Sequence, residues 1–422
     1  GTSQDKDDVV YEEKDSTFYT SVGNTRSMDY IEINISSTVS SEVRLLKANE
    51  PLNQPRTFLQ REKDHLYSVD HDPADDRFIV ESNWNAINFR LLETSLENSQ
   101  DKNGWKELIP HRDDVLLQAV IPFPDHLVVL ERQNGLRQLK IVNKNSNSSQ
   151  PINFNDPSYT AYLAANPEYN TDRFYFGYSS MRIPDSLFSV KLSSGRKRLL
   201  KEAEVKGSFS SSDYKVERKL IEGRDGTKVP VSLVYKRTLF NKGENPLFVY
   251  GYGSYGNSID AGFSSSRLSL LDRGFIFAIA HIRGGQELGR SWYEDGKMFK
   301  KLNTFYDFID VTKGLLAQGY GSNDRVFAGG GSAGGLLMGA IVNMEPKLYK
   351  GIISNVPFVD VITTMSDPSI PLTTGEYDEW GNPENKKEFE YMMKYSPYDN
   401  IEENEYPSIL VTAGLWDSQV QY

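Results

Sequence analysis

The chain of 422 residues contains no cysteine. This absence excludes disulfide bonds, thiolate metal sites and a cysteine nucleophile, and it fits a reducing compartment, so we expect a cytoplasmic protein. Histidine is scarce as well, which argues against a metal site. We expect no metal, and no organic cofactor is implied either. The five histidines show none of the spacings of metal ligands: His65, His71, His111, His126 and His281.

Long hydrophobic runs are absent too. No apolar stretch reaches the roughly 20 residues that a membrane-spanning helix needs, so we expect no membrane association. The formal net charge of −11 argues against nucleic acid as a partner and would favour cationic ligands. A chain of this length is expected to form two domains, and its composition leaves the oligomeric state open.

Residues 1–205 alternate short apolar or aromatic runs with polar turns, and they show almost no helical periodicity. A repeat runs through this half. Aspartates open strand-like runs at intervals of 47, 49 and 47 residues, at Asp29, Asp76, Asp125 and Asp172. A period in the forties with several strands per unit is typical of propeller blades, so we predict a partial all-β propeller of about four blades. An irregular β-sandwich is the alternative.

A serine-rich segment, 208–212, marks a predicted boundary, and the second domain is expected at 206–422. In this half, strands of the buried type alternate with helical stretches, which predicts a doubly wound parallel sheet. The strands are predicted at 246–250, 275–280, 326–328, 352–356 and 409–412, and one helix is predicted at 305–316.

Ser332 lies in Gly-Gly-Ser-Ala-Gly, residues 330–334, the G-x-S-x-G pattern that holds a nucleophilic serine on a sharp strand-to-helix turn. An apolar run precedes it, and the apolar residues 335–342 suit a buried helix after it. A tight turn or a phosphate cradle is the alternative, but no G-K-[ST] follows that would favour a phosphate-binding loop. We therefore predict that Ser332 is a nucleophile at the C-terminal edge of a strand.

A serine nucleophile needs a base and an acid that orients the base, and in this kind of sheet the chain order is serine, acid, histidine. Asp417 ends the segment 409–417, which begins with the strand-like run 409–412, and it lies 85 residues after Ser332, so it is the candidate acid; a turn or capping aspartate is the alternative. No histidine follows Ser332, and His281 precedes it, which makes a structural histidine the better interpretation. We expect the base beyond Tyr422, a C-terminal truncation, and an inactive fragment.

Four motifs now carry a resemblance. They are Tyr-Gly-Tyr-Gly-Ser-Tyr-Gly at 250–256, Arg-Gly-Gly-Gln-Glu-Leu-Gly at 283–289, Gly-Gly-Ser-Ala-Gly-Gly at 330–335 and Thr-Thr-Gly-Glu-Tyr-Asp-Glu-Trp-Gly-Asn-Pro at 373–383. In this order they resemble oligopeptidase B, the trypsin-like branch of the prolyl oligopeptidase family of serine peptidases. The resemblance covers essentially the whole chain and implies an α/β-hydrolase domain with a seven-bladed propeller, so an N-terminal portion is also expected to be absent here.

The resemblance implies roles for individual residues. Ser332 matches the nucleophile and Asp417 the triad acid, with the histidine beyond Tyr422. A tyrosine hydroxyl and a backbone N–H hold the oxyanion in the family, and they match Tyr252 and the amide of Ala333. The alternatives are that Tyr252 serves packing and that Ala333 is only the first residue of a helix.

The same resemblance implies a specificity. Two carboxylates of the family pair with an arginine or lysine at P1 and match Glu376 and Asp378, whereas acids in such a loop are otherwise usually solvated. A further acid for a basic P2 residue matches Asp260, but Gly262 stands where the family has a second acid, which weakens that preference.

The implied function is cleavage of short basic peptides on the C-terminal side of arginine or lysine, with the propeller excluding folded proteins. Another peptidase or an esterase of this fold, or a non-catalytic fragment, are the alternatives.

Overall fold

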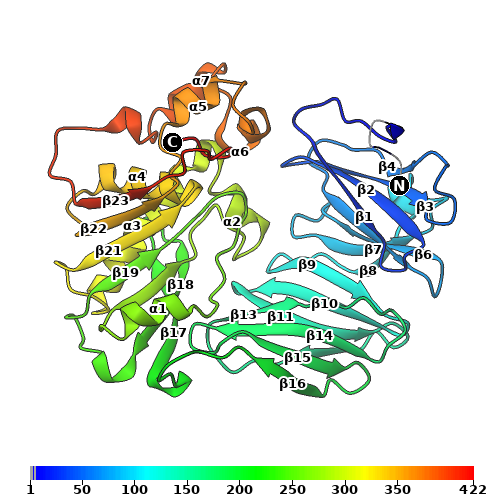
Figure 1. Cartoon of the computed structure of the whole chain (residues 1–422), viewed down its shortest axis with the longest axis horizontal. Coiled ribbons are helices and arrows are strands. Elements are labelled where there is room, and N and C mark those ends of the chain that lie inside the picture. The colour runs from blue at the N-terminus through cyan, green and yellow to red at the C-terminus, as the bar shows by residue number, and fades with distance from the viewer. Residues whose placement is uncertain (1–2, 4–5) are drawn as a thin grey trace.

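The computed structural model describes residue 3 and residues 6–422. Figure 1 shows two parts side by side. One consists of four small sheets from the first half of the chain, and the other is built on one large sheet with helices from the second half. The predicted combination of propeller blades with an α/β-hydrolase sheet is confirmed.

Each small sheet has four antiparallel strands in chain order, which is the construction of a propeller blade. The four repeat aspartates directly precede the second strand of each blade. The strands are β1 (Tyr19–Asn24), β2 (Tyr30–Ser36), β3 (Ser41–Lys47) and β4 (Arg56–Leu59); β5 (Tyr67–Asp72), β6 (Arg77–Ser82), β7 (Arg90–Thr94) and β8 (Lys106–Ile109); β9 (Val115–Pro122), β10 (His126–Gln133), β11 (Leu136–Asn143) and β12 (Ser149–Ile152); and β13 (Tyr159–Leu163), β14 (Arg173–Ser180), β15 (Ser186–Lys191) and β16 (Lys197–Glu202).

The blades pack face to face, and this explains the continuously apolar runs in the second strands of the two middle blades, Phe78–Val80 of β6 and Leu127–Leu130 of β10. In β6, Phe78 and Val80 contribute to the core shared with the first blade, whereas Ile79 points the other way into the core shared with the third. In β10, Val129 likewise faces the second blade and Val128 faces the fourth. Because successive strand residues point to opposite faces, a blade buried on both sides needs apolar residues at every position.

The large sheet has seven strands in the order β17-β18-β20-β19-β21-β22-β23. The last five strands in this order are parallel, as predicted, whereas β17 and β18 form an antiparallel hairpin that the sequence pattern did not indicate. The strands are β17 (Tyr214–Glu222), β18 (Lys228–Lys236), β19 (Leu247–Tyr250), β20 (Ile276–Ala280), β21 (Val326–Gly331), β22 (Gly351–Asn355) and β23 (Ser408–Thr412).

Helices cover both faces of this sheet. In β20, Ile276 and Ala278 join the core beneath α3 and α4, whereas Phe277 and Ile279 join a second core that includes Leu271 of α1. The helices are α1 (Ser265–Leu271), α2 (Arg290–Glu294), α3 (Leu302–Ala317), α4 (Ala333–Met344), α5 (Val361–Ser366), α6 (Tyr377–Trp380) and α7 (Lys386–Met392). Among the described residues, no helix combines the length and apolar character needed to cross a bilayer.

The two parts touch near the carboxyl edge of the large sheet. Thr38 of the first blade donates a hydrogen bond to the Gly375 carbonyl at 3.4 Å, and Asn88 of the second blade accepts one from the Arg290 amide at 2.8 Å. Parallel strands direct their following loops to this edge, where ligands bind in open α/β sheets. The propeller therefore borders the edge at which Ser332 was predicted.

Candidate active site

Ser332 is the single residue between β21 and α4. Its backbone has φ 57° and ψ −119°, a left-handed conformation that is rare for a residue with a side chain. Hydrogen bonds hold this conformation: the Ser332 amide donates to the Asn355 carbonyl at 2.9 Å, and its carbonyl accepts from the Gly335 amide at 2.8 Å. Strain maintained in this way is common at active sites.

The glycines around Ser332 are needed because the turn leaves no space for a Cβ at their positions. A Cβ on Gly330 would lie 2.3 Å from the Gly334 carbonyl oxygen, and a Cβ on Gly334 would lie 2.9 Å from the Gly251 carbonyl oxygen. Any larger residue at either position would push the strand and the helix apart. The G-x-S-x-G pattern is therefore required by the backbone path that exposes the serine.

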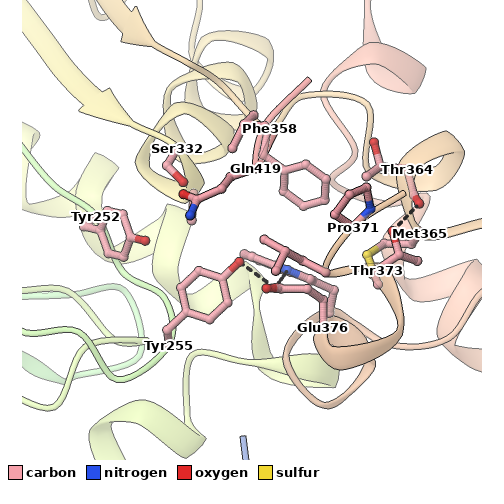
Figure 2. A pocket seen from close by; sticks show the side chains of 14 residues that line it. Tyr252, Tyr255, Ser332, Phe358, Thr364, Met365, Pro371, Thr373, Glu376 and Gln419 are labelled. Atoms are coloured by element: carbon pink, nitrogen blue, oxygen red, sulfur yellow. Dashed lines mark hydrogen bonds between the residues drawn. The ribbon is translucent and has the colours of Figure 1, made fainter. Parts of the chain in front are cut away.

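Ser332 opens into a cavity of about 320 Å³, which Figure 2 shows from close by. Ser332, Tyr252 and Gln419 lie toward one end of it, and Glu376 lies across from them. The lining consists of Tyr252, Tyr255, Ser332, Ala333, Phe358, Thr364, Met365, Pro371, Leu372, Thr373, Glu376, Trp380, Gln419 and Val420. The cavity thus combines a serine, a phenol and a carboxylate within otherwise largely apolar walls.

Two hydrogen-bond donors accompany the serine. Tyr252 follows β19, and Figure 2 shows its hydroxyl pointing into the cavity. Burial raises the pKa of Tyr252, and hydrogen bonding to Ser332 opposes this rise, so the phenol keeps its proton at neutral pH. Ala333 is the first residue of α4, where an amide has no carbonyl within the helix to bond. A phenol and a free amide on either side of a serine can bind one anionic oxygen.

Among the residues that the structure describes, Glu376 is the only one that brings a carboxylate to the lining of the cavity. Its Oε2 accepts hydrogen bonds from the Tyr255 hydroxyl at 2.6 Å and from the Trp380 Nε1–H at 2.8 Å. Burial raises the pKa of Glu376, and these two hydrogen bonds lower it in part. With one oxygen held by two donors, the carboxylate is oriented to bind a cation that enters the cavity.

Asp378 does not join Glu376 in this cavity. The segment forms a 3₁₀ turn and then α6, and two residues that are two positions apart in a helix point in different directions. Asp378 is exposed, whereas Glu379 is fully buried and accepts a hydrogen bond from the Tyr255 amide at 2.9 Å. The expected two-carboxylate fork around the cavity is therefore not formed by Glu376 and Asp378.

Asp417 lies in the segment after β23, outside the cavity lining. Its Oδ1 accepts hydrogen bonds from the amides of Gln419 and Val420, both at 2.9 Å, and these bonds lower its pKa. These are the contacts of a turn aspartate, the alternative weighed for this residue. Gln419 and Val420 themselves line the cavity, so Asp417 lies at the same edge of the sheet as Ser332.

Asp260 is engaged by the propeller. Its carboxylate forms ion pairs with Arg132 at 2.8 Å and Arg137 at 3.1 Å, and it accepts a hydrogen bond from Thr160 at 3.1 Å. It does not line the cavity. In this arrangement two arginines of the third blade already occupy the carboxylate that was expected to bind a basic P2 residue.

His281 serves the fold near the contact with the propeller. It is buried, its Nε2 lies 2.7 Å from the Ser232 hydroxyl, and its Nδ1 lies 3.7 Å from a carboxylate oxygen of Glu287. Within the described part of the chain, no histidine lines the cavity beside Ser332. In the same part, no cluster of three metal-ligating side chains is found.

Some residues of the cavity had no predicted role. Tyr255 and Trp380 lie inside two of the motifs that carry the resemblance, but no role was predicted for either. Both donate hydrogen bonds to Glu376, and their rings meet edge to face with 5.6 Å between ring centres. Phe358 packs beside Trp380 at 5.4 Å. A signal for Trp380 was available, because it lies four residues after Glu376, which is one helical turn.

Comparison with known proteins gives a consistent result. The sequence pattern of the prolyl oligopeptidase family matches residues 261–422, and the pattern of the N-terminal β-propeller domain of prolyl oligopeptidase matches residues 1–203. The chain is 47% identical to dipeptidyl aminopeptidase BI of Pseudoxanthomonas mexicana over 424 residues, which covers 100% of this chain and 58% of that relative. It is 40% identical to protease 2 of Moraxella lacunata, covering 100% of this chain and 60% of that relative.

Solved structures show the same likeness. Oligopeptidase B from Leishmania major superposes with a TM-score of 0.96 at 38% identity, covering 100% of this chain and 60% of that one. Oligopeptidase B from Trypanosoma brucei, in a closed form with covalently bound antipain, gives a TM-score of 0.95 at 38% identity and 61% coverage of that chain. The chain thus spans about three fifths of the length of these relatives. From its blades, its hydrolase sheet and both matched patterns, the chain belongs to the prolyl oligopeptidase family.

Proposed function

We propose that this chain supplies the nucleophile, the oxyanion donors and the P1 site of a serine peptidase that cleaves short peptides after arginine or lysine. The observation that carries the proposal is the carboxylate of Glu376, oriented by Tyr255 and Trp380 in the same cavity as Ser332. A half-buried carboxylate that has two neutral donors and, among the described residues, no cationic partner is stabilised when a cation binds beside it.

The walls of the cavity favour arginine over lysine in this proposal. With Asp378 outside, one carboxylate is available, and a guanidinium can use both its fork and its flat faces. The rings of Tyr255, Phe358 and Trp380 line the cavity and can stack on such a plane. A lysine ammonium is a point charge that gains less from these walls, so we expect arginine to be preferred at P1.

In the proposed reaction the Ser332 hydroxyl attacks the peptide carbonyl that follows the bound P1 side chain. The carbonyl oxygen becomes an oxyanion between the Tyr252 hydroxyl and the Ala333 amide. A histidine base and an acid that orients it complete such a mechanism. We keep Asp417 as the proposed acid, supported by its position just before the cavity residues Gln419 and Val420.

A basic residue at P2 is expected to help only modestly. Asp260 already pairs with Arg132 and Arg137, and a third cation would have to compete with two arginines for one carboxylate. The second family position is Gly262, which has no side chain. We therefore propose only a weak preference for a basic P2 residue.

A second candidate function follows from the relative that is 47% identical, which is named a dipeptidyl aminopeptidase. An enzyme that releases dipeptides must bind the free α-amino group of its substrate, whereas an endopeptidase accepts a blocked amino terminus. Hydrolysis of matched peptides with free and acylated amino termini separates the two functions. Retained cleavage of the acylated Arg-P1 peptide supports the endopeptidase, and its loss supports the dipeptidyl activity.

The experiment that tests the main proposal uses peptides that differ only at P1, with arginine, lysine, citrulline or norleucine. We expect kcat/KM of the active enzyme to fall in this order. Citrulline retains the shape of arginine without its charge, so equal rates for arginine and citrulline would contradict a role of Glu376 in reading charge.

Replacing Tyr252 with phenylalanine removes one of the two proposed oxyanion donors. We expect kcat to fall by about a hundredfold with little change in KM, because the hydrogen bond strengthens only as the oxyanion forms. Steady-state kinetics on the Arg-P1 peptide measure this. A change in KM alone would mean that Tyr252 contacts the ground state and has no oxyanion role.

The proposed P1 site also predicts a dependence on pH. Burial, followed by the nearby charge of Glu379, raises the pKa of Glu376 above its ordinary value of about 4.3. As pH falls through this raised pKa, Glu376 gains a proton and loses its charge. The ratio of kcat/KM for arginine to that for norleucine should therefore fall on the acid side, and the ratio cancels the titration of the catalytic base. A ratio that is constant down to pH 4.5 would contradict the assignment.

A further inference from the structure

One short loop, residues 252–256, carries both Tyr252 and Tyr255. It follows β19, and it therefore links the proposed oxyanion site to the side chain that orients Glu376. Gly253, Tyr255 and Gly256 have φ values of 76°, 59° and 63°, so three residues of this loop adopt left-handed backbone conformations. Such a loop needs contacts from its surroundings to stay in one conformation.

Lys301, the residue before α3, makes two short hydrogen bonds to this loop. Its Nζ donates to the Gly253 carbonyl at 2.6 Å and to the Ser254 hydroxyl at 2.7 Å. Lys301 is only 1% exposed, and its ammonium also lies 4.9 Å from the centre of the Trp380 ring. Both of its hydrogen-bond acceptors thus belong to the two residues that follow Tyr252.

Burying a lysine lowers the stability of the fold unless its charge is compensated, because the ammonium loses its water. Burial lowers the pKa of Lys301 to about 8, and the charge of Glu379 raises it in part. A leucine or methionine would fill the volume without this penalty. The charge is therefore best explained by what it holds, which is the carbonyl next to Tyr252.

Other contacts confine the loop on its remaining sides, and the two hydrogen bonds from Lys301 complete its surroundings at residues 253 and 254. A Cβ on Gly253 would lie 2.4 Å from Cγ2 of Thr304, so the loop is pressed against α3 on that side. A Cβ on Gly284 would lie 1.9 Å from the Gly253 carbonyl oxygen. On the other side, the buried carboxylate of Glu379 accepts a hydrogen bond from the Tyr255 amide at 2.9 Å.

We propose that Lys301 is a positioning residue for the oxyanion site: by holding the Gly253 carbonyl and the Ser254 hydroxyl, it fixes the Tyr252 hydroxyl where the oxyanion forms. The inference rests on the proposed function, because it gives Lys301 a role only in a reaction that uses Tyr252. Lys301 touches neither the cavity nor the reacting atoms. Its effect passes through the backbone of residues 252–254.

The test is a double-mutant cycle of Lys301→Met and Tyr252→Phe in the active enzyme. Methionine fills the volume without donating hydrogen bonds. We expect Lys301→Met to lower kcat by about tenfold to a hundredfold, since small misplacements of a catalytic group have effects of this size. The loss should be similar for Arg-P1 and norleucine-P1 peptides, with KM nearly unchanged. In the Tyr252→Phe background the same substitution should lower kcat by less than about twofold.

Two further variants make the cycle decisive. Lys300→Met is the matched control, because Lys300 is an exposed neighbour that pairs with Asp295, and we expect its kcat to equal that of the wild type. Lys301→Gln retains an N–H donor, so it should recover part of kcat. It also replaces Lys301→Met in the cycle if the methionine variant does not fold.

The outcomes separate the inference from the proposed function. If Tyr252→Phe leaves kcat unchanged, the oxyanion role of Tyr252 fails, and the inference falls with it. If Tyr252→Phe lowers kcat but Lys301→Met lowers it equally in both backgrounds, Lys301 supports the fold in general and the inference alone is overturned. An unchanged kcat for Lys301→Met in the wild-type background overturns it as well.

Discussion

Replacing Ser332 with alanine is expected to lower kcat on an Arg-P1 peptide by about 10⁶-fold, the loss found when a triad serine is removed. Without the hydroxyl no acyl intermediate can form, and only catalysis by binding and by the oxyanion donors remains. KM should change little, because the substitution leaves the proposed P1 site at Glu376 intact. Steady-state kinetics of the active enzyme, with enough enzyme to detect the residual rate, measure the effect.

The control is Ser366→Ala at the exposed end of α5, which should leave kcat at the wild-type value. A fluorophosphonate reagent gives an independent measurement, because it forms a covalent bond only with an activated serine. We expect the label on Ser332 of the wild type, located by peptide mass, and no label on the alanine variant. Labelling of the variant at another serine would show that the nucleophile lies elsewhere.

The strand-to-helix turn at Ser332 could be predicted from sequence because its demands are local. Gly330 is needed because the carbonyl oxygen of Gly334, four residues later, lies within 3 Å of a would-be Cβ, whereas the carbonyl that crowds Gly334 comes from Gly251, outside the pentapeptide. The apolar residues before and after the pentapeptide specify the buried strand and helix. The catalytic role of Ser332 is a separate matter, and it remains a prediction until the kinetics are measured.

The propeller blades were recognisable through the regular repeat of strand-like runs, each opened by an aspartate, which form the second strand of each blade. The first and fourth strands of the blades gave no such signal. All six residues of β16 are exposed, and β1 is exposed along nearly its whole length, so neither has an apolar pattern. Pairing with a neighbour, rather than hydrophobic periodicity, makes these segments strands. The same holds for the hairpin of β17 and β18, which joins the large sheet antiparallel to its neighbour.

Contacts made across the fold could not be predicted from sequence. The pair Glu376 and Asp378 was expected from a resemblance, but the start of α6 leaves Asp378 exposed and buries Glu379, which accepts a hydrogen bond from the Tyr255 amide. Lys301 meets acceptors 47 and 48 residues away in sequence, one of them a backbone carbonyl. A lysine in such a place has no pattern of its own, because its partners are set by the packing of α3 against the 252–256 loop.

Replacing Glu376 with glutamine should lower kcat/KM for an Arg-P1 peptide by about 30-fold to 4,000-fold. A guanidinium that enters the cavity loses its water, and the carboxylate is what compensates it. Glutamine keeps the size of the side chain, and its amide oxygen can still accept from Tyr255 and Trp380. The charge is therefore the main difference. A norleucine-P1 peptide has no charge to compensate, so its low rate should hardly change and can even rise.

Asp378→Asn is the matched comparison. It also removes one negative charge, two residues from Glu376, but the Asp378 side chain lies outside the cavity. The geometry predicts a much smaller loss for it than for Glu376→Gln. The measurement is kcat/KM of both variants on arginine and norleucine peptides at one low salt concentration, since screening weakens exposed charges more than buried ones. Equal losses on both peptides for Glu376→Gln would mean that Glu376 supports the fold of the cavity, because a group that reads the P1 charge cannot affect a neutral side chain equally. The proposed preference for basic P1 residues would then have to be withdrawn, while the role of Ser332 would stand on its own test.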